Sequence, residues 1–226
     1  MENKTVDRRN FLKIGAGISA GAMAMGGFLP RALAATCGLT PPQTEGPFYP
    51  GEQNFTAEND LTRVPGAPRR ALGEIIYISG VVTDQACRPV AGANVEIWQA
   101  CEAGSYNNAK DPNPAPRDPY FKYWGETFTD ETGAYSFKSI RPGAYPADTD
   151  WMRPAHIHFK VSKLGFHGLI TQMYFKDDPY NEKDLILQAL PKPEQARVVV
   201  DFGDAGLGRE AGARAGNFDI SIRSAR

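Results

Sequence analysis

The stretch Trp151-Met152-Arg153-Pro154-Ala155-His156-Ile157-His158-Phe159-Lys160-Val161 predicts a β-strand that carries two histidines. Residues 155–161 are apolar or β-branched at most positions, and Pro154 can only open such a run. Side chains two positions apart on a strand point to the same face, about 6.6 Å apart along the chain. His156 and His158 are therefore placed to bind one metal ion together. The same pattern is also typical of two histidines that simply pack in a sheet.

Short strand-like segments lie on both sides of this stretch. Residues 75–83 and 94–99 are rich in β-branched and aromatic side chains, and a turn separates them. Residues 127–138 predict a hairpin around the turn Asp130-Glu131-Thr132-Gly133. We expect further strands at residues 169–175, 197–202 and 218–222, and a short helix at residues 185–190.

Many short strands at short spacing favour an all-β fold, and we expect a single antiparallel β-sandwich domain with long loops. Residues 36–72 are rich in proline, glycine and polar side chains, and they predict an irregular N-terminal arm laid over the core. Residues 73–226 would then form the sandwich, with a long loop over residues 104–118.

The first 35 residues have the pattern of an export signal. Arg8-Arg9 lies in a twin-arginine motif, and the apolar stretch 14–29 that follows is too short to span a bilayer comfortably. Ala32-Leu33-Ala34 is typical of a cleavage site. We therefore expect the twin-arginine export machinery as a partner and a periplasmic or secreted protein after cleavage. This route is often used by proteins that fold around a cofactor before export.

Charge and cysteine content set further bounds. The formal net charge is −1 and no basic run occurs, so we do not expect nucleic acid as a partner. An oxidising destination permits a disulfide among Cys37, Cys87 and Cys101. The extended residues 93–100 span roughly 26 Å, which disfavours the pair of Cys87 and Cys101. Pairing with Cys37 stays open, and Thr36 before it is a poor residue for a lipid-anchored cysteine.

Two tyrosines are candidate oxygen donors for such a metal. Tyr145 lies in the turn 141–146, eleven residues before His156, and Tyr106 lies in the loop after the strand at 94–99. Phenolate is a hard anionic donor, and together with two imidazoles it suits Fe(III) better than zinc or copper(I). The chain has nine tyrosines, so any one of them is more often a packing residue.

Several longer runs carry recognisable motifs: Gly80-Val81-Val82-Thr83-Asp84, Arg88-Pro89-Val90, Val95-Glu96-Ile97-Trp98-Gln99-Ala100, Gly104-Ser105-Tyr106, Asp130 to Phe137, Ile140-Arg141-Pro142-Gly143-Ala144-Tyr145-Pro146, Trp151 to Phe159, and Leu169 to Phe175. In these runs the sequence resembles the intradiol ring-cleavage dioxygenases. The resemblance covers about residues 44–180, and the Arg-Pro-x-His-x-His run with Tyr-Pro upstream is its most specific part.

The resemblance implies a function and a set of site residues. It implies cleavage of a catechol-type ring with O2 to a cis,cis-muconate-type diacid. It also implies that Arg153 and Gln172 lie against the substrate, and that Arg153 offsets developing negative charge. Tyr145 would be the ligand that leaves and takes a catechol proton, whereas Tyr106 would stay bound. The ligands of one Fe(III) ion per chain would be Tyr106, Tyr145, His156 and His158.

Other protein classes share parts of this pattern. A cupin would place a glutamate four or five residues after its His-x-His motif, where this chain has Ser162 and Lys163. A non-catalytic transthyretin-like or carboxypeptidase-regulatory-like sandwich would explain the strands and turns without needing the histidine pair. A divergent family member could also bind iron without turning over a catechol. Arg153 could instead form a structural ion pair with an acid such as Asp150.

Some features of the chain depart from the family or lie outside its motif. The helical N-terminal dimerisation domain of catechol 1,2-dioxygenases is missing, and residues 107–123 match no substrate-defining segment. The substrate and a homo-oligomeric state therefore stay open. Glu45 and Tyr49 of the arm are expected at the mouth of the site, and His167 is expected on the surface.

Overall fold

The computed structural model describes residues 37–50 and 58–225. These residues belong to one compact unit, Ala34–Arg226. The expected export signal lies outside the described residues. In the described part of the chain, no helix is long and apolar enough to cross a membrane.

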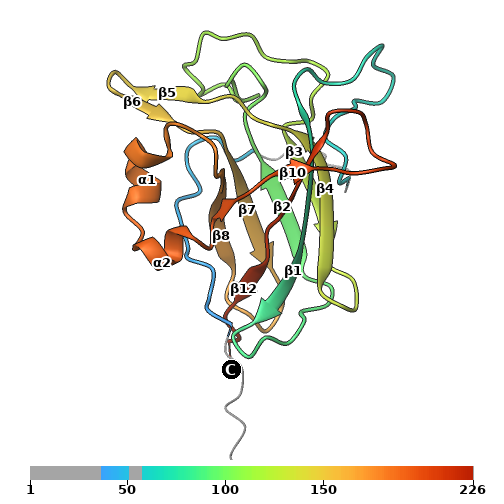
Figure 1. Ribbon diagram of the computed structural model, residues 1–226, viewed down its shortest axis with the longest axis vertical. Helices are drawn as coiled ribbons and strands as arrows, with labels where there is room; N and C mark the ends of the chain where they lie inside the picture. Colours follow the sequence, from blue (N-terminus) through green and yellow to red (C-terminus); the bar gives the residue numbers. More distant parts are fainter. Residues whose placement is uncertain (1–36, 51–57, 226) are drawn as a thin grey trace, which may run out of the picture. The chain divides into compact units, whose positions relative to one another are not determined.

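The first of two five-stranded sheets is built around strand β1 (Figure 1). Strand β4 pairs with β1 in antiparallel orientation, whereas β11 and β12 pair with it in parallel, and β10 extends the sheet beyond β11. The bounds of these strands are β1 Ile75–Asp84, β4 Ala134–Ile140, β10 Gly203–Asp204, β11 Arg214–Asn217 and β12 Ile220–Ile222.

The second sheet has the order β3-β2-β7-β8-β9, with the histidine strand β7 at its centre. Strands β2 and β8 flank β7, and both run antiparallel to it. The strand predicted at residues 155–161 is thus confirmed. The bounds are β2 Asn94–Trp98, β3 Trp124–Phe128, β7 His156–Ser162, β8 Leu169–Phe175 and β9 Val199–Val200.

The hydrophobic core lies between the two sheets, and Phe159 shows how they join. This fully buried side chain of β7 packs its ring 6.5 Å from Phe137 of β4 and 4.9 Å from Phe218, just before β12. Burial of such a ring contributes about 1.5–3 kcal/mol. Because side chains alternate along a strand, Phe159 in the core leaves its two neighbours facing outward. The expected all-β sandwich is confirmed.

The remaining elements lie beside the second sheet. A two-stranded hairpin consists of β5 (Tyr145–Asp148) and β6 (Trp151–Arg153). A 3₁₀ turn (Asn181–Lys183) and two short helices, α1 (Leu185–Gln188) and α2 (Lys192–Gln195), connect β8 to β9. Figure 1 shows both helices below the β5–β6 hairpin. The first helix falls within the predicted range 185–190, whereas the second was not predicted.

The hairpin predicted over residues 127–138 is wrong, because its two strands belong to different sheets. Strand β3 pairs with β2, and β4 pairs with β1. Asp130 and Gly133 do form a tight turn, as expected. Thr129 just before it exchanges backbone hydrogen bonds with Gly92 and Ala93, which holds β3 against the start of β2. The turn therefore carries the chain from one sheet to the other.

The expectation of purely antiparallel pairing also needs correction. Strand β9 runs parallel to β8, and both β11 and β12 run parallel to β1. The segment of β11 contains the sequence Arg214-Ala215-Gly216-Asn217, which carries no strand signal of its own. Gly216 is required there because a Cβ atom would lie 2.8 Å from the ring of Phe202. Tertiary packing rather than β-propensity forms this strand.

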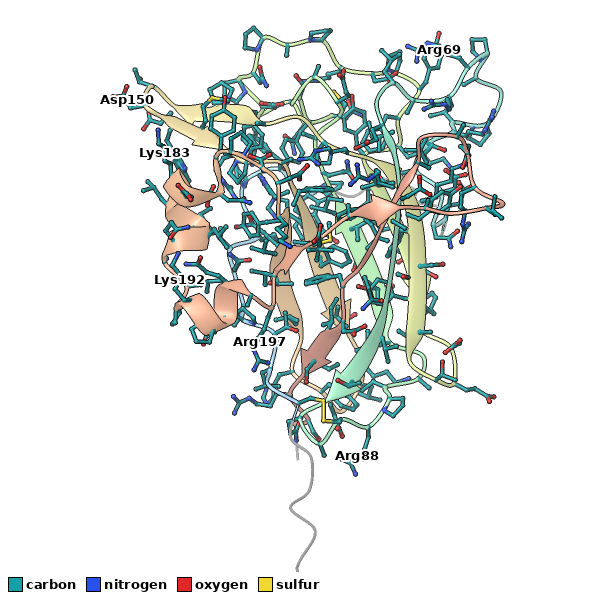
Figure 2. The ribbon with its side chains drawn as sticks, viewed as in Figure 1. Arg69, Arg88, Asp150, Lys183, Lys192 and Arg197 are labelled. Atoms are coloured by element: carbon teal, nitrogen blue, oxygen red, sulfur yellow. A yellow bond between two sulfur atoms is a disulfide. The ribbon has the colours of Figure 1, made fainter. Side chains whose placement is uncertain are left out.

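A disulfide joins Cys37 to Cys87, and Cys101 is free and buried. The pairing that the sequence disfavoured is indeed not formed. The bond ties the start of the arm to the turn after β1, and Figure 2 shows it in yellow near the labelled Arg88. From there residues 37–50 run along the edge of the second sheet, where Gln43 donates a backbone hydrogen bond to Ile170 of β8.

Candidate active site

The two histidines of β7 lie on the outer face of the second sheet, away from the core. His156 is 2% exposed and His158 is 3% exposed, and their ring centroids lie 5.0 Å apart. The neighbouring strands place Trp98 and Gln172 directly opposite His158. The outer face of the sheet is therefore as well covered here as the face that packs in the core.

Two tyrosines from other elements join the histidines. Tyr106 comes from the loop after β2, and Tyr145 opens strand β5. Their ring centroids lie 5.6 Å apart, and the ring of Tyr145 lies 5.6 Å from that of His156. The hydroxyl of Tyr106 is 3.4 Å from Nε2 of His156. All four side chains that the sequence suggested as metal ligands thus meet in one buried cluster.

Local hydrogen bonds fix the backbone that carries the tyrosines. The backbone nitrogen of Tyr106 donates to Oδ2 of Asp111 at 2.6 Å, which closes the start of the 104–118 loop. Tyr145 pairs with Arg153 across the β5–β6 hairpin. Both tyrosines are therefore positioned by their own segments, and the two segments meet only in the folded chain.

The hydrogen bonds of the imidazoles leave nitrogen lone pairs available. Nδ1 of His156 donates to the Pro154 carbonyl at 2.7 Å, so Nε2 is the acceptor that faces Tyr106. The ring of His158 stacks on Trp98 at 4.7 Å, and its Nδ1 atom is buried without a hydrogen-bond partner among the described residues. Burial and the nearby Arg153 charge lower the pKa of both histidines, that of His158 to about 3. Both rings are thus neutral, as metal ligands must be.

The two phenols need a cation before they can lose their protons. Burial raises the pKa of Tyr106 well above its usual value and also raises that of Tyr145, although Arg153 opposes both shifts. A buried phenolate is costly unless a positive charge compensates it. Within residues 37–50 and 58–225, no group of three or more His, Cys, Asp or Glu side chains could hold a metal ion. A trivalent ion bound by two neutral imidazoles and two phenolates fits this donor set.

Arg153 is held at the side of this cluster by two side chains. It is 4% exposed, and its Nε donates to Oδ2 of Asp184 at 2.6 Å while Nη2 donates to Oε1 of Gln172 at 2.6 Å. The suggested ion pair with Asp150 is wrong, because Asp150 is exposed on the turn between β5 and β6 (Figure 2). The partner lies 31 positions along the chain, and sequence proximity could not reveal it.

The arm closes the outer face above the site. Phe48 packs its ring 4.7 Å from Tyr106 and 6.4 Å from Tyr145. Tyr49 packs edge-on against Trp98 at 4.9 Å, and its hydroxyl donates to Glu96 at 2.7 Å. Tyr49 therefore fastens the arm to the sheet, and Phe48 is the arm residue that covers the tyrosines.

The structure also places the other residues that the sequence singled out. Glu45 is half-buried, and against the opposing effect of burial its charge adds to the hydrogen bond of Tyr49 and the charge of Glu96 in raising the pKa of Lys160. Gln172, which the resemblance placed against the substrate together with Arg153, is fully buried beside Arg153, and its side-chain amide also donates to the Thr44 carbonyl. His167 is exposed, as expected, and lines a different surface cavity. Asp184 and Phe48 are the residues of the site that sequence reasoning missed.

Comparison with known proteins assigns the family. The family described as Dioxygenase matches residues 44–223, which include every residue of the cluster. The β chain of protocatechuate 3,4-dioxygenase from Burkholderia cepacia is 38% identical over 181 residues, which cover 78% of this chain and 76% of that protein. The chain belongs to the intradiol ring-cleavage dioxygenase family.

Two further relatives show how much of each chain the similarity covers. Catechol 1,2-dioxygenase of Candida albicans is 37% identical over 123 residues, and the match spans only 39% of that protein. The dioxygenase domain of a carbohydrate-binding fusion protein from Streptomyces sp. SirexAA-E has a TM-score of 0.63 and 28% identity, with 83% of this chain and all of that domain aligned. This chain is therefore similar to known dioxygenases both in sequence and in its two-sheet fold.

Gly46 offers a test of how closely the arm approaches the site. Its φ is 71°, and a Cβ atom there would lie 3.4 Å from Cε1 of His158. We expect Gly46→Ala to lower the free energy of unfolding by about 1–2 kcal/mol, because alanine is strained at positive φ. We also expect it to shift the ring Cε1–H signal of His158 in metal-free protein. The chain has three histidines, so NMR of histidine-labelled protein resolves this signal.

Gly66→Ala is the matched control for this substitution. Gly66 has a φ of 76°, and nothing lies within 4 Å of its added Cβ. It should lose similar stability while the three histidine signals stay in place. An unmoved His158 signal in Gly46→Ala would contradict the close contact.

Proposed function

We propose that this chain is a non-haem Fe(III)-dependent dioxygenase that cleaves a catechol-type ring with O2 to a cis,cis-muconate-type diacid. The observation that carries this proposal is the buried cluster of two neutral imidazoles and two phenols beside a buried arginine. Membership of the intradiol family supports it.

The four residues of the cluster would hold one Fe(III) ion per chain. Bound there, Fe(III) would supply a Lewis-acidic centre that takes a catechol as a dianion and makes its ring reactive toward O2. Fe(III) bound by two phenolates and two neutral imidazoles would carry a net charge of +1. A small anion would balance this charge. The proposed ligands are Tyr106, Tyr145, His156 and His158.

The two tyrosines would take different roles in proton transfer. A catechol must lose two protons to bind as a dianion, and a phenolate oxygen is a suitable base. We assign one of these protons to the phenolate oxygen of Tyr145, which lies on the small β5–β6 hairpin outside both main sheets, and the second to the charge-balancing anion, a hydroxide, which would leave as water. Tyr106 is assigned as the retained phenolate, because its hydroxyl contacts His156 and its backbone is anchored to Asp111.

Arg153 and Gln172 would act on the charge of the bound ring. The guanidinium is buried, so its charge is poorly screened and acts strongly on negative charge that develops nearby. Its contact with Gln172 fixes one edge of the planar group. A preoriented cation of this kind stabilises a transition state without having to reorganise.

We further propose that the protein is exported by the twin-arginine machinery and acts outside the cytoplasm. The pattern Arg8-Arg9 with Ala32-Leu33-Ala34 motivates this, and the disulfide between Cys37 and Cys87 supports an oxidising compartment. Recovery of the protein from the periplasm or medium with residues 1–35 removed tests the proposal. Retention in the cytoplasm with Met1 still present would contradict it.

Iron binding provides the first functional prediction. Protein folded with iron available should contain one Fe per chain and show a visible charge-transfer band from tyrosinate to Fe(III). His156→Ala should lose both, because it removes a neutral donor from a four-residue site. His167→Ala removes the exposed third histidine and should keep both. Stoichiometric zinc in place of iron would contradict the proposed site, and a colourless protein without metal would favour a non-catalytic β-sandwich module.

Ring cleavage is the second functional prediction. On a panel of catechols that includes hydroxyquinol and larger lignin-derived catechols, we expect one O2 consumed per ring. The product should be a conjugated diacid that absorbs in the ultraviolet. A yellow semialdehyde would show that the ring opens on the extradiol side, and the mechanism would then be wrong.

The tyrosine pair gives the third functional prediction. Tyr145→Phe should slow anaerobic formation of the catechol complex, by about 10²–10⁴-fold if it removes a general base. Tyr106→Phe should bind catechol at a more nearly normal rate but react poorly once O2 is added. Stopped-flow mixing before and after O2 addition separates the two steps. If the two behaviours were exchanged, the two roles would have to be exchanged as well.

A further inference from the structure

We propose that Asp184 is a positioning residue for Arg153, and that it fixes the guanidinium beside the site while anchoring the segment that begins helix α1. The inference rests on the proposed function in one respect, namely that Arg153 serves the reaction. It concerns a residue far from the His-x-His motif, on the connection between β8 and β9.

Both oxygens of the Asp184 carboxylate are occupied. Oδ2 accepts the hydrogen bond from Nε of Arg153 at 2.6 Å. Oδ1 accepts from the backbone nitrogens of Ile186 at 2.9 Å and Leu187 at 2.7 Å. Asp184 and Arg153 thus form an ion pair, and the hydrogen bonds from Ile186 and Leu187 cap helix α1. Because one rigid carboxylate makes both sets of contacts, the position of Arg153 depends on that of the helix.

Because this ion pair is buried, loss of either charge would be costly. Asp184 is 0% exposed, and its bond to Arg153 is that arginine's only ion pair among the described residues. A buried cation without its counter-charge is strongly unfavourable, so the guanidinium would move or draw in water if Asp184 were neutral. Leu187, three positions on, is itself buried in the main core, so the carboxylate is anchored to the core through α1.

The remaining contacts of Arg153 leave Asp184 as the decisive anchor. Nη2 is bound to Gln172, whose Oε1 also accepts from the hydroxyl of Tyr174 at 3.1 Å. That amide oxygen is neutral and shared, so it offers direction but no counter-charge. Arg153 lies next to the cluster, because it pairs with Tyr145 across the β5–β6 hairpin and its partner Gln172 lies directly opposite His158 in the sheet. A displaced guanidinium would therefore change the field at the proposed ligands.

The main test is Asp184→Asn in the full chain. Asparagine can still accept the backbone hydrogen bonds at a helix start, so the cap is kept while the charge is lost. We expect kcat to fall on the order of 10²-fold with a smaller change in KM, because misplacement of a positioned group by about 1 Å costs about that much. In arginine-labelled, metal-free protein, the Nε–H signal of Arg153 should lose its protection from exchange. This second readout does not depend on catalysis.

Asp84→Asn is the matched control. Asp84 is also buried, pairs with Arg88 at 2.7 Å, and accepts backbone hydrogen bonds from Ala86 and Arg88 in the turn after β1. Because Arg88 is exposed, this substitution should cost less stability than Asp184→Asn, and it should leave kcat and the Arg153 signal unchanged. Equal effects of the two substitutions on kcat would reduce Asp184 to a structural residue and overturn the proposal.

A double-mutant cycle separates action through Arg153 from general damage. In an Arg153→Lys background, Asp184→Asn should cost less than about threefold further in kcat, because contacting residues are not additive when one acts through the other. Fully additive losses would overturn the proposal. Asp184→Glu keeps the charge and is the variant to use if Asp184→Asn does not fold. Its kcat is expected to lie between those of the wild type and Arg153→Lys. An intact kcat in Asp184→Glu with an unprotected Arg153 signal would also overturn it.

The two proposals fail in different ways. If the wild-type protein cleaves no catechol, the proposed function fails, yet the Arg153 signal still decides whether Asp184 holds the guanidinium. If the wild type is active and Asp184→Asn keeps both kcat and the protected signal, only the positioning role is wrong.

Discussion

The alternation of side chains along β7 is the constraint on which the rest of the structure depends. Ile157 and Phe159 point into the core between the sheets, so His156 and His158 must point to the outer face. A shift of one residue in the pairing with β2 or β8 would exchange the two sets and place imidazoles in the core. The core packing of Phe159 therefore also fixes the position of the candidate site.

An outer face that carries buried polar groups needs a cover of its own. Three segments without long strands supply it: the arm at residues 37–50, the loop at 104–118 and the β5–β6 hairpin. Each carries a side chain of the site or against it, namely Phe48, Tyr106 and Tyr145. The disulfide at Cys37 fixes the beginning of the arm, and Tyr49 fastens the arm to Glu96. The same three segments therefore cover the sheet and contribute side chains to the site or against it.

The buried charge of Arg153 links this cover to the β8–β9 connection. A guanidinium at this depth is tolerated because Asp184 balances it and Gln172 accepts a second hydrogen bond. Asp184 in turn holds the first turn of α1, which packs through Leu187 on the core. The electrostatics of the outer face thus rest on packing that lies elsewhere in the chain. Such an arrangement suits a site where a fixed charge must keep one orientation.

The sequence by itself determined the strand at β7, the sandwich class and the four converging side chains, because each follows from local pattern or from a motif shared with the family. Local pattern also predicted the turn at Asp130, but it could not tell that the turn leads from one sheet into the other. The hydrogen bonds of Thr129 to the start of β2 decide that, and they are made between residues more than thirty positions apart. In the same way, only the tertiary structure paired Arg153 with Asp184 and Cys37 with Cys87. Periodicity records which face of a strand is buried, whereas the choice of a distant partner depends on how the whole chain packs.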